Sequence, residues 1–374
     1  MVKRVDLFYH GILVIVRDDR QQRPEDFLLH DGIIVGNIAH YDRFNAQGGS
    51  IRGTAQNNLF LIYKTQNTVK MLFVDYLSVV GIVKRYSAEL PYCLLLQIFY
   101  EFLIYAAVAQ NIVGGNAGLP AVIINMMRGG PGLGTIQPGQ ADYNMTVKGG
   151  ANGDYHNVVL APASVQEAVN MVMEAFDIAD QYLLPVIILA DGLIGQMMEP
   201  VEFNYVPRPN LPEKTWALVG HYGAERSNIK NLVIEPDECE AWNHDHFKVY
   251  DEVVKNEQAW EEYKMDDAEY AFVSYGTASR VVRTAIGYLR AEGYKVGMIR
   301  PKTLWPFPQK AFDKFNDKIK KFLDVEMSMG QMVPDVAYAC NDRNKVAFHG
   351  RTGGNVPTVD EIVEFGKEVM GGDK

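Results

Sequence analysis

The stretch from Leu119 to Pro162 constrains the fold more than any other part of the sequence. Two short apolar runs of strand length, residues 120–125 and 158–161, enclose a long loop with eight glycines between Gly129 and Gly153. A loop of roughly 30 residues between two buried strands is uncommon and usually functional. The stretch therefore predicts an α/β sheet with a functional loop at one edge.

Arg128 stands where the first apolar run gives way to the glycines. Ligands of open α/β sheets bind at the carboxyl ends of the strands, and glycine lets the backbone approach a ligand closely. Arg128, with Gly129 and Gly130, is therefore a candidate clamp for a small carboxylate. The alternative is a surface arginine that is ion-paired beside a loop. The glycines fit neither the dinucleotide-binding pattern nor a P-loop.

Helix and strand signals alternate along the rest of the chain. Ser164-Val-Gln-Glu167 is a capping box that opens a helix with one apolar face, and a buried strand is predicted at 185–190. A second alternation begins near Ala268. The sequence thus predicts an α/β fold with two doubly wound, Rossmann-like domains, residues 1–235 and 268–374, joined by a linker helix at 236–267.

The first 115 residues carry weaker signals. Residues 12–16 and 32–38 have the composition of strands. The apolar run Leu90–Ala109 has the length of a membrane span, but Glu101 lies inside it and favours a buried helix. A membrane-attached protein stays open as an alternative at this point.

Charge and cysteine content exclude several classes of partner. The net charge of −10 and the pI of about 5.4 argue against nucleic acid or an anionic membrane as the main partner. The three cysteines, Cys93, Cys239 and Cys340, are far apart and form no CxxC pair, so we expect neither zinc nor an iron–sulfur cluster to be ligated by the cysteines of this chain alone. The sparse cysteines and the absence of a secretory pattern predict a cytoplasmic location.

Three further motifs have two interpretations each. Asp191-Gly192 is similar to part of the metal-binding motif of thiamine diphosphate enzymes, or it is a helix or turn cap. The segment 274–277 is a strand-to-helix turn that either binds an anion or caps its helix. The turn Arg351-Thr-Gly-Gly354 is a simple turn or a subunit contact.

The motifs from Leu119 onward resemble those of the α subunit of 2-oxoacid:ferredoxin oxidoreductases. The resemblance rests on Arg128-Gly-Gly-Pro-Gly-Leu-Gly134, on Gln137-Pro-Gly-Gln140-Ala-Asp-Tyr143, and on the segments 192–200, 300–308 and 350–354. It is strongest to the branched-chain type, 2-oxoisovalerate (3-methyl-2-oxobutanoate) ferredoxin oxidoreductase. It covers about residues 115–370.

The resemblance implies a reaction and a set of partners. The family decarboxylates a 2-oxoacid on thiamine diphosphate, passes electrons through iron–sulfur clusters to ferredoxin, and releases the acyl group to coenzyme A. This subunit would supply the pyrimidine-type domain and the transketolase C-terminal-like domain. Thiamine diphosphate and Mg²⁺ would be shared with a β subunit, and the [4Fe-4S] clusters would lie in other subunits, such as γ and δ. Arg128 matches the arginine that holds the substrate carboxylate, and the physiological setting would be anaerobic branched-chain amino acid catabolism.

The first 115 residues depart from the family. Its Gly-Asn-Glu-Ala opening, its Tyr-Pro-Ile-Thr-Pro loop and the glutamate that activates the cofactor are not found there. Either this region has diverged and the chain is a non-catalytic assembly or regulatory paralogue, or the sequence before about Gly115 is a frame-shifted translation. The identity of the activating glutamate stays open.

Overall fold

The computed structural model describes residues 119–131, 134–149, 153–214 and 233–371 in full. Of the part before residue 119, it describes only the backbone of six strands. These are β1 (Ile12–Arg17), β2 (Gly32–Ile38), β3 (Asn45–Ala46), β4 (Gly49–Ser50), β5 (Asn58–Thr65) and β6 (Thr68–Val74). The strands predicted at 12–16 and 32–38 are confirmed, whereas the run Leu90–Ala109 lies outside the described residues.

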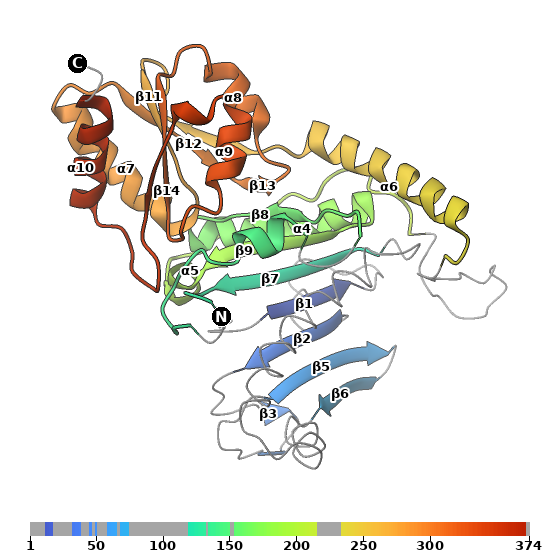
Figure 1. The fold of residues 1–374 in the computed structure, drawn as a ribbon. Helices are drawn as coiled ribbons and strands as arrows, with labels where there is room; N and C mark the ends of the chain where they lie inside the picture. Colours follow the sequence, from blue (N-terminus) through green and yellow to red (C-terminus); the bar gives the residue numbers. More distant parts are fainter. Residues whose placement is uncertain are drawn as a thin grey trace, which may run out of the picture.

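The first sheet is mixed. Its centre is formed by three parallel strands, β8 (Val158–Leu160), β9 (Pro185–Asp191) and β7 (Ala121–Met127). The full order is β13-β8-β9-β7-β1-β2-β5-β6, and every strand outside the central three pairs antiparallel. Figure 1 shows this sheet below the C-terminal part of the chain. The prediction of a doubly wound sheet therefore holds for the centre, and the antiparallel flanks are a correction to it.

The central strands are apolar on both sides because both of their faces are covered. All seven residues of β9 are buried, the pattern expected of a parallel strand inside a sheet. Helix α4 (Val165–Tyr182) covers one face. The predicted capping box opens this helix, since the Glu167 N–H donates to Ser164 Oγ at 3.1 Å and the Ala163 N–H donates to the Glu167 carboxylate at 2.8 Å.

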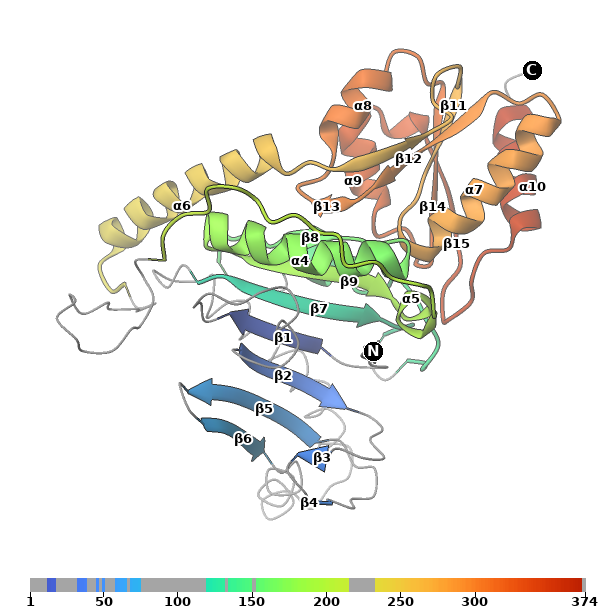
Figure 2. The same cartoon turned by 180° about the vertical axis from the view of Figure 1, so that it is seen from behind.

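The second sheet has the order β10-β12-β11-β14-β15. Its parallel strands are β12 (Val296–Pro301), β11 (Tyr270–Val273), β14 (Lys321–Glu326) and β15 (Val346–Gly350). Helices α7 (Gly276–Ala291) and α10 (Val359–Gly371) cover one face, and α8 (Gln309–Phe315) and α9 (Val333–Ala339) cover the other (Figure 2). The predicted alternation of strands and helices after Ala268 is confirmed, and a 3₁₀ turn, Arg343–Lys345, precedes β15.

The segment between the two sheets differs from the expected linker helix. Helix α6 (Pro236–Asn256) ends eleven residues before position 267, and Trp260–Tyr263 forms β10, the antiparallel edge of the second sheet. Charged residues fit this edge strand because one of its sides faces solvent. The helix itself projects past the first sheet (Figure 2).

The two sheets are connected more closely than a linker would require. Strand β13 (Thr303–Trp305) follows β12 directly, yet it pairs with β8 of the first sheet. One apolar cluster contains Ile123 and Ile187 from the first sheet together with Val273 and Phe322 from the second. The two halves therefore share a core, which the prediction of two domains did not indicate.

Two short helices complete the described structure. Helix α3 (Tyr143–Val147) lies within the glycine-rich stretch, and α5 (Gly192–Gln196) follows β9. None of the helices described here is long and apolar enough to cross a membrane.

Candidate functional site

Arg128 lies at the carboxyl end of β7, where the sequence placed it. Its backbone forms an isolated bridge with Pro138, so the chain returns alongside it after a closed loop. The Gly129 N–H donates to the Gln137 carbonyl, and the Thr135 N–H donates to the Gly129 carbonyl, each at 2.9 Å. The half-buried Arg128 side chain reaches across this loop, where Nη1 lies 3.5 Å from the Thr135 carbonyl oxygen. These contacts place the Arg128 cation at the carboxyl end of a central strand of the first sheet.

The two glycines after Arg128 have different roles in the packing. A Cβ on Gly129 would lie 2.9 Å from the Gly354 nitrogen, so the loop touches the turn 351–354 of the C-terminal half directly. Among the described residues, a Cβ on Gly130 would meet only Ala141, at 3.8 Å. Gly129 is therefore required for close packing, whereas Gly130 has room beside it. The 351–354 turn therefore packs against a segment of its own chain. This packing does not depend on a subunit contact, which was the second interpretation of the turn.

One carboxylate lies close to Arg128. Asp142 accepts a hydrogen bond from Asn125 Nδ2 at 3.4 Å. Burial raises the pKa of the Asp142 carboxyl, while the Asn125 hydrogen bond and the Arg128 charge oppose that rise. The carboxyl group of Asp142, near Arg128, thus loses its proton less readily than an ordinary aspartate.

The Asp191-Gly192 motif is a structural cap. Asp191 is fully buried at the end of β9 and accepts hydrogen bonds from the backbone N–H groups of Leu193 and Ile194 in α5. It also accepts from the Thr277 N–H at 2.8 Å and the Thr277 hydroxyl at 2.6 Å. Burial raises the pKa of Asp191, against the effect of these bonds. With its oxygens committed to these donors, the carboxylate is not presented to a metal.

The same contacts decide between the two interpretations of the 274–277 turn. Its Thr277 N–H is taken by the Asp191 carboxylate. A Cβ on Gly276, whose φ is +56°, would lie 2.7 Å from Asp191 Oδ2. A carboxylate from this chain thus occupies the place where an external anion was considered. The helix is capped by the distant Asp191 and not by a side chain of the turn, since its N-cap residue Tyr275 makes no side-chain cap bond.

The residues between 137 and 148 join the two halves. Tyr143 is fully buried, and its hydroxyl donates to Asp335 Oδ2 at 2.7 Å. Gln331 accepts from the Asn144 N–H and donates to the Ala141 carbonyl, both at 2.8 Å. The sequence placed this segment in the long loop predicted to be functional and gave no sign of these contacts, because the partners are almost 200 positions away along the chain.

Two buried carboxyls share one face of β14. Asp324 and Glu326 are two residues apart, the period that puts side chains on the same side of a strand, and both are fully buried. Glu326 accepts from the Met332 N–H at 3.0 Å and from Ser328 Oγ at 2.8 Å. Burial, then the charge of Glu326, raises the pKa of Asp324 well above its usual range. The alternation Phe-Leu-Asp-Val-Glu in a buried strand was the sequence signal for this pair, and it was overlooked.

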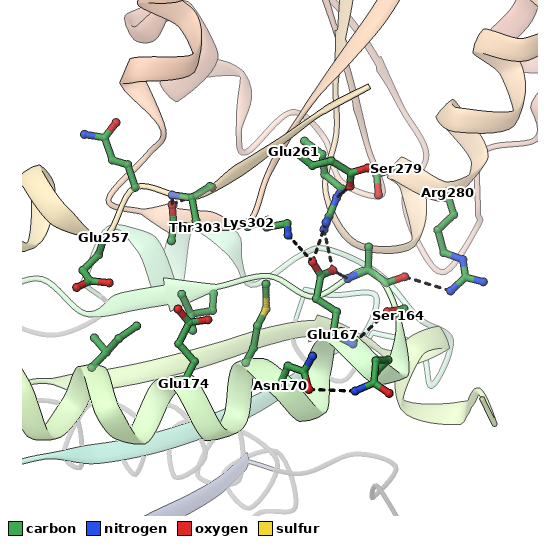
Figure 3. A pocket seen from close by; sticks show the side chains of 18 of the residues that line it. Ser164, Glu167, Asn170, Glu174, Glu257, Glu261, Ser279, Arg280, Lys302 and Thr303 are labelled. Carbon is green, nitrogen blue, oxygen red and sulfur yellow. Dashed lines mark hydrogen bonds and ion pairs between the residues drawn. The ribbon is translucent and has the colours of Figure 1, made fainter. Parts of the chain in front are cut away.

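A large cleft lies on the other side of the junction (Figure 3). It has a volume of about 1100 Å³ and runs between α4 and the strands and helices of the C-terminal half. The Arg300 side chain lies in the cleft. Its guanidinium donates hydrogen bonds of 2.7 and 2.9 Å to Glu167 and of 2.7 Å to Glu261. Burial raises the pKa of Glu167, but the hydrogen bonds and charge of Arg300 outweigh it and lower the pKa.

This cleft does not coincide with the predicted site. Arg128 is not among its lining residues. The arginines that do line it are ion-paired, as in Arg208–Glu257 at 2.7 Å and Arg280–Glu199 at 2.9 Å. It is an electrostatically balanced joint between the halves, and we base no ligand assignment on it.

No cluster of three or more histidine, cysteine, aspartate or glutamate side chains in the described part of the chain has the arrangement of a metal site. The free cysteines Cys239 and Cys340 lie on α6 and directly after α9. Cys93 falls outside the described residues.

Two protein-family models match this chain, and the boundary between them falls at the start of its C-terminal half. Residues 109–262 match the model of the thiamine diphosphate-binding domain of pyruvate flavodoxin/ferredoxin oxidoreductases, and residues 268–362 match core domain II of pyruvate:ferredoxin oxidoreductase. The ketoisovalerate oxidoreductase subunit VorB of Methanothermobacter thermautotrophicus is 44% identical over 255 residues, which are 68% of this chain and 72% of VorB. The 2-oxoglutarate synthase subunit KorA of Methanocaldococcus jannaschii is 31% identical over 65% of this chain and 72% of its own length.

A solved structure shows the same fold. It is the 2-oxoglutarate:ferredoxin oxidoreductase of Magnetococcus marinus, with a TM-score of 0.62 and 22% identity. The match covers 72% of this chain and 51% of that one, so this chain corresponds to about half of that protein's length.

Proposed function

This chain belongs to the family of 2-oxoacid:ferredoxin oxidoreductase subunits, and we propose that within such a complex it holds the carboxylate of the 2-oxoacid through Arg128. The observation that carries the proposal is the place of Arg128: the end of a buried parallel strand, inside a closed glycine loop. Arginine presents two parallel N–H donors that match a planar carboxylate.

The described residues do not supply a site for the metal and diphosphate of the cofactor. The carboxylate that most resembles a metal ligand, Asp191, is occupied by Thr277, Leu193 and Ile194. We therefore assign thiamine diphosphate and Mg²⁺ to a site shared with a β subunit, and the [4Fe-4S] clusters to γ and δ subunits. This chain would contribute substrate binding, and we derive no chemical step from it alone.

The identity to VorB supports a branched-chain 2-oxoacid as the substrate, because the relatives named for 2-oxoglutarate are less similar. The products would be an acyl-CoA, carbon dioxide and reduced ferredoxin. Branched-chain amino acid catabolism in a cytoplasm that maintains low-potential ferredoxin, and hence an anaerobic metabolism, fits this reaction.

A non-catalytic assembly or regulatory subunit is the alternative. It is favoured by one observation: the family models match only from residue 109 onward, so the first part of the chain carries no family signature. Such a subunit would retain the contacts between the halves and lack turnover.

Substitution of Arg128 in the assembled complex tests the proposal. Arg128→Ala should cost about 2–5 kcal/mol in kcat/KM, the range for truncating one side of a desolvated charge pair, and Arg128→Lys should recover part of it because the charge remains while the bidentate geometry is lost. The assay is steady-state reduction of ferredoxin or a viologen dye with 2-oxoisovalerate, beside a melting curve. Unchanged kinetics in Arg128→Ala would refute the substrate role. A wild-type complex that assembles but never turns over would favour the alternative.

A further inference from the structure

Gln140 is fully buried and connects the Arg128 loop to both central strands of the second sheet. Its Nε2 donates to the Tyr275 carbonyl at 2.9 Å, and its Oε1 accepts from the Met327 N–H at 2.8 Å. Its own N–H donates to the Met327 carbonyl at 2.9 Å. Tyr275 and Met327 follow the neighbouring parallel strands β11 and β14, so three hydrogen bonds fix Gln140 against the carboxyl edge of the second sheet.

The residue before Gln140 packs directly on Arg128. A Cβ on Gly139 would lie 3.1 Å from the Arg128 carbonyl carbon and 3.0 Å from the Gly129 nitrogen. The Gly139 N–H points to the Met127 carbonyl at 3.5 Å. Gln140 directly follows Gly139, and Gly139 packs on the backbone of Arg128. A shift of Gln140 is therefore transmitted to the backbone that carries the Arg128 guanidinium.

The second half touches the loop at another point. A Cβ on Gly354, whose φ is +91°, would lie 2.3 Å from Gln137 Cβ. Gln137 is the residue whose carbonyl accepts the Gly129 N–H and closes the loop. The C-terminal half therefore contacts this segment at two places, at Gln140 and through the 353–354 turn, which lies against both Gly129 and Gln137.

We propose that Gln140 is a positioning residue, which sets Arg128 for the oxoacid only when the two halves are docked. The proposal rests on the substrate role of Arg128 given above. Misplacing a substrate-orienting group by about 1 Å is enough to lower a rate by roughly 100-fold. The substrate site would thus depend on a part of the chain that does not touch the substrate.

The test is a double-mutant cycle in the assembled complex, with 2-oxoisovalerate and a viologen dye. Gln140→Met keeps the side-chain length and removes its two side-chain hydrogen bonds. We expect the KM for the oxoacid to rise and kcat/KM to fall by roughly 10–100-fold, with the KM for coenzyme A unchanged. In the Arg128→Ala background the same substitution should have almost no further effect, because residues that act as one unit are not additive. Equal losses in both backgrounds would overturn the proposal.

Gln331 offers a matched control. It also bridges the two halves with both ends of its amide, but it contacts Ala141 and Asn144 beyond the loop. Gln331→Met should lower the melting temperature and leave the KM for the oxoacid unchanged. If it raises that KM as much as Gln140→Met does, general loosening of the joint explains the effect and the positioning role is wrong.

Gly354→Ala perturbs the same loop from the 353–354 turn instead of from Gln140. It tests the proposal even if Gln140→Met does not fold. The added methyl must displace Gln137, so the KM for the oxoacid should rise in this variant as well. An unchanged KM would contradict the proposal. A large effect of Arg128→Ala with silent Gln140 and Gly354 variants would refute the positioning role and leave the proposed function standing.

Discussion

Asp191 and Thr277 form a fully or almost fully buried polar contact between the two halves of the chain. The Asp191 carboxylate accepts the backbone N–H of Thr277 at 2.8 Å and its hydroxyl at 2.6 Å, although 86 positions separate the residues. The carboxylate belongs to the end of β9, and the two donors belong to the first turn of α7. A negative charge at a helix N-terminus is favourable, so this contact caps α7 and docks the first sheet on it at the same time.

Asp191→Ala should therefore weaken folding strongly. It leaves the N–H groups of Thr277, Leu193 and Ile194 without their acceptor, and each buried donor left in this way costs about 1–3 kcal/mol. We expect a loss of about 2–5 kcal/mol in the free energy of unfolding, measured by chemical denaturation. Asp191→Asn keeps one acceptor oxygen and should lose less. Similar stability of the alanine variant and the wild type would show that the contact contributes little.

The buried pair on β14 predicts a pH dependence of stability. Burial and the charge of Glu326 raise the pKa of Asp324 well above its usual range, and burial also raises the pKa of Glu326. Among the described residues, the other ionisable groups whose charges act on the pair include the acidic groups of Tyr143, Tyr275 and Asp335. Asp335 is itself ion-paired with Lys148. An acid with a raised pKa holds more protons folded than unfolded, so the free energy of unfolding falls as pH rises above the unfolded pKa and levels off above the folded one.

The slope of that fall is about 1.4 kcal/mol per pH unit for one proton. Asp324→Asn removes the titrating group, so its free energy of unfolding should fall less steeply than that of the wild type from about pH 5 upward. Asp317→Asn is the control, since Asp317 is exposed and its loss should leave the slope unchanged. Parallel curves for the wild type and Asp324→Asn would mean that the pair is not protonated in the folded protein.

Local signals allowed much of this fold to be predicted. The capping box at Ser164 and Glu167 predicted the start of α4, because a cap is satisfied by residues close in sequence. The apolar run 185–190 predicted β9 for a similar reason, since burial on both faces leaves a continuous apolar pattern. Arg128 was placed at a strand end from the change of composition alone.

The joint between the halves could not be predicted in this way. Gln140 finds its acceptor on Tyr275 and its donor on Met327, and nothing in the local sequence of any of the three indicates the others. β13 shows the same limit, because a three-residue strand after β12 carries no signal that it pairs with the other sheet. Contacts of this kind depend on how the two sheets pack against each other. The local patterns of a single sequence do not reveal that packing.

The assignment of clusters to other subunits predicts that this chain, purified alone, is colourless and binds no iron. Iron–sulfur clusters in this class are held by cysteine thiolates, and the chain has three cysteines without a CxxC pair. Iron analysis and an absorbance scan after anaerobic reconstitution would check this. Stoichiometric iron with a charge-transfer band at roughly 400 nm would reject the division of roles among the subunits.

The origin of the first 115 residues is decided by the coding DNA. The family models begin at residue 109, and the family motifs that follow are nearly complete, so the change is abrupt. Gradual divergence would leave partial motifs on both sides of such a point, whereas a shifted frame removes them all at once. We therefore expect that another frame of the DNA before Gly115 encodes the Tyr-Pro-Ile-Thr-Pro loop and the activating glutamate. A chain rebuilt with that frame should turn over 2-oxoisovalerate in the complex at a higher rate than the present chain, because positioned acid–base catalysis contributes about 10²–10⁴-fold. If no frame contains either motif, the region has diverged, and the assembly or regulatory role becomes the stronger proposal.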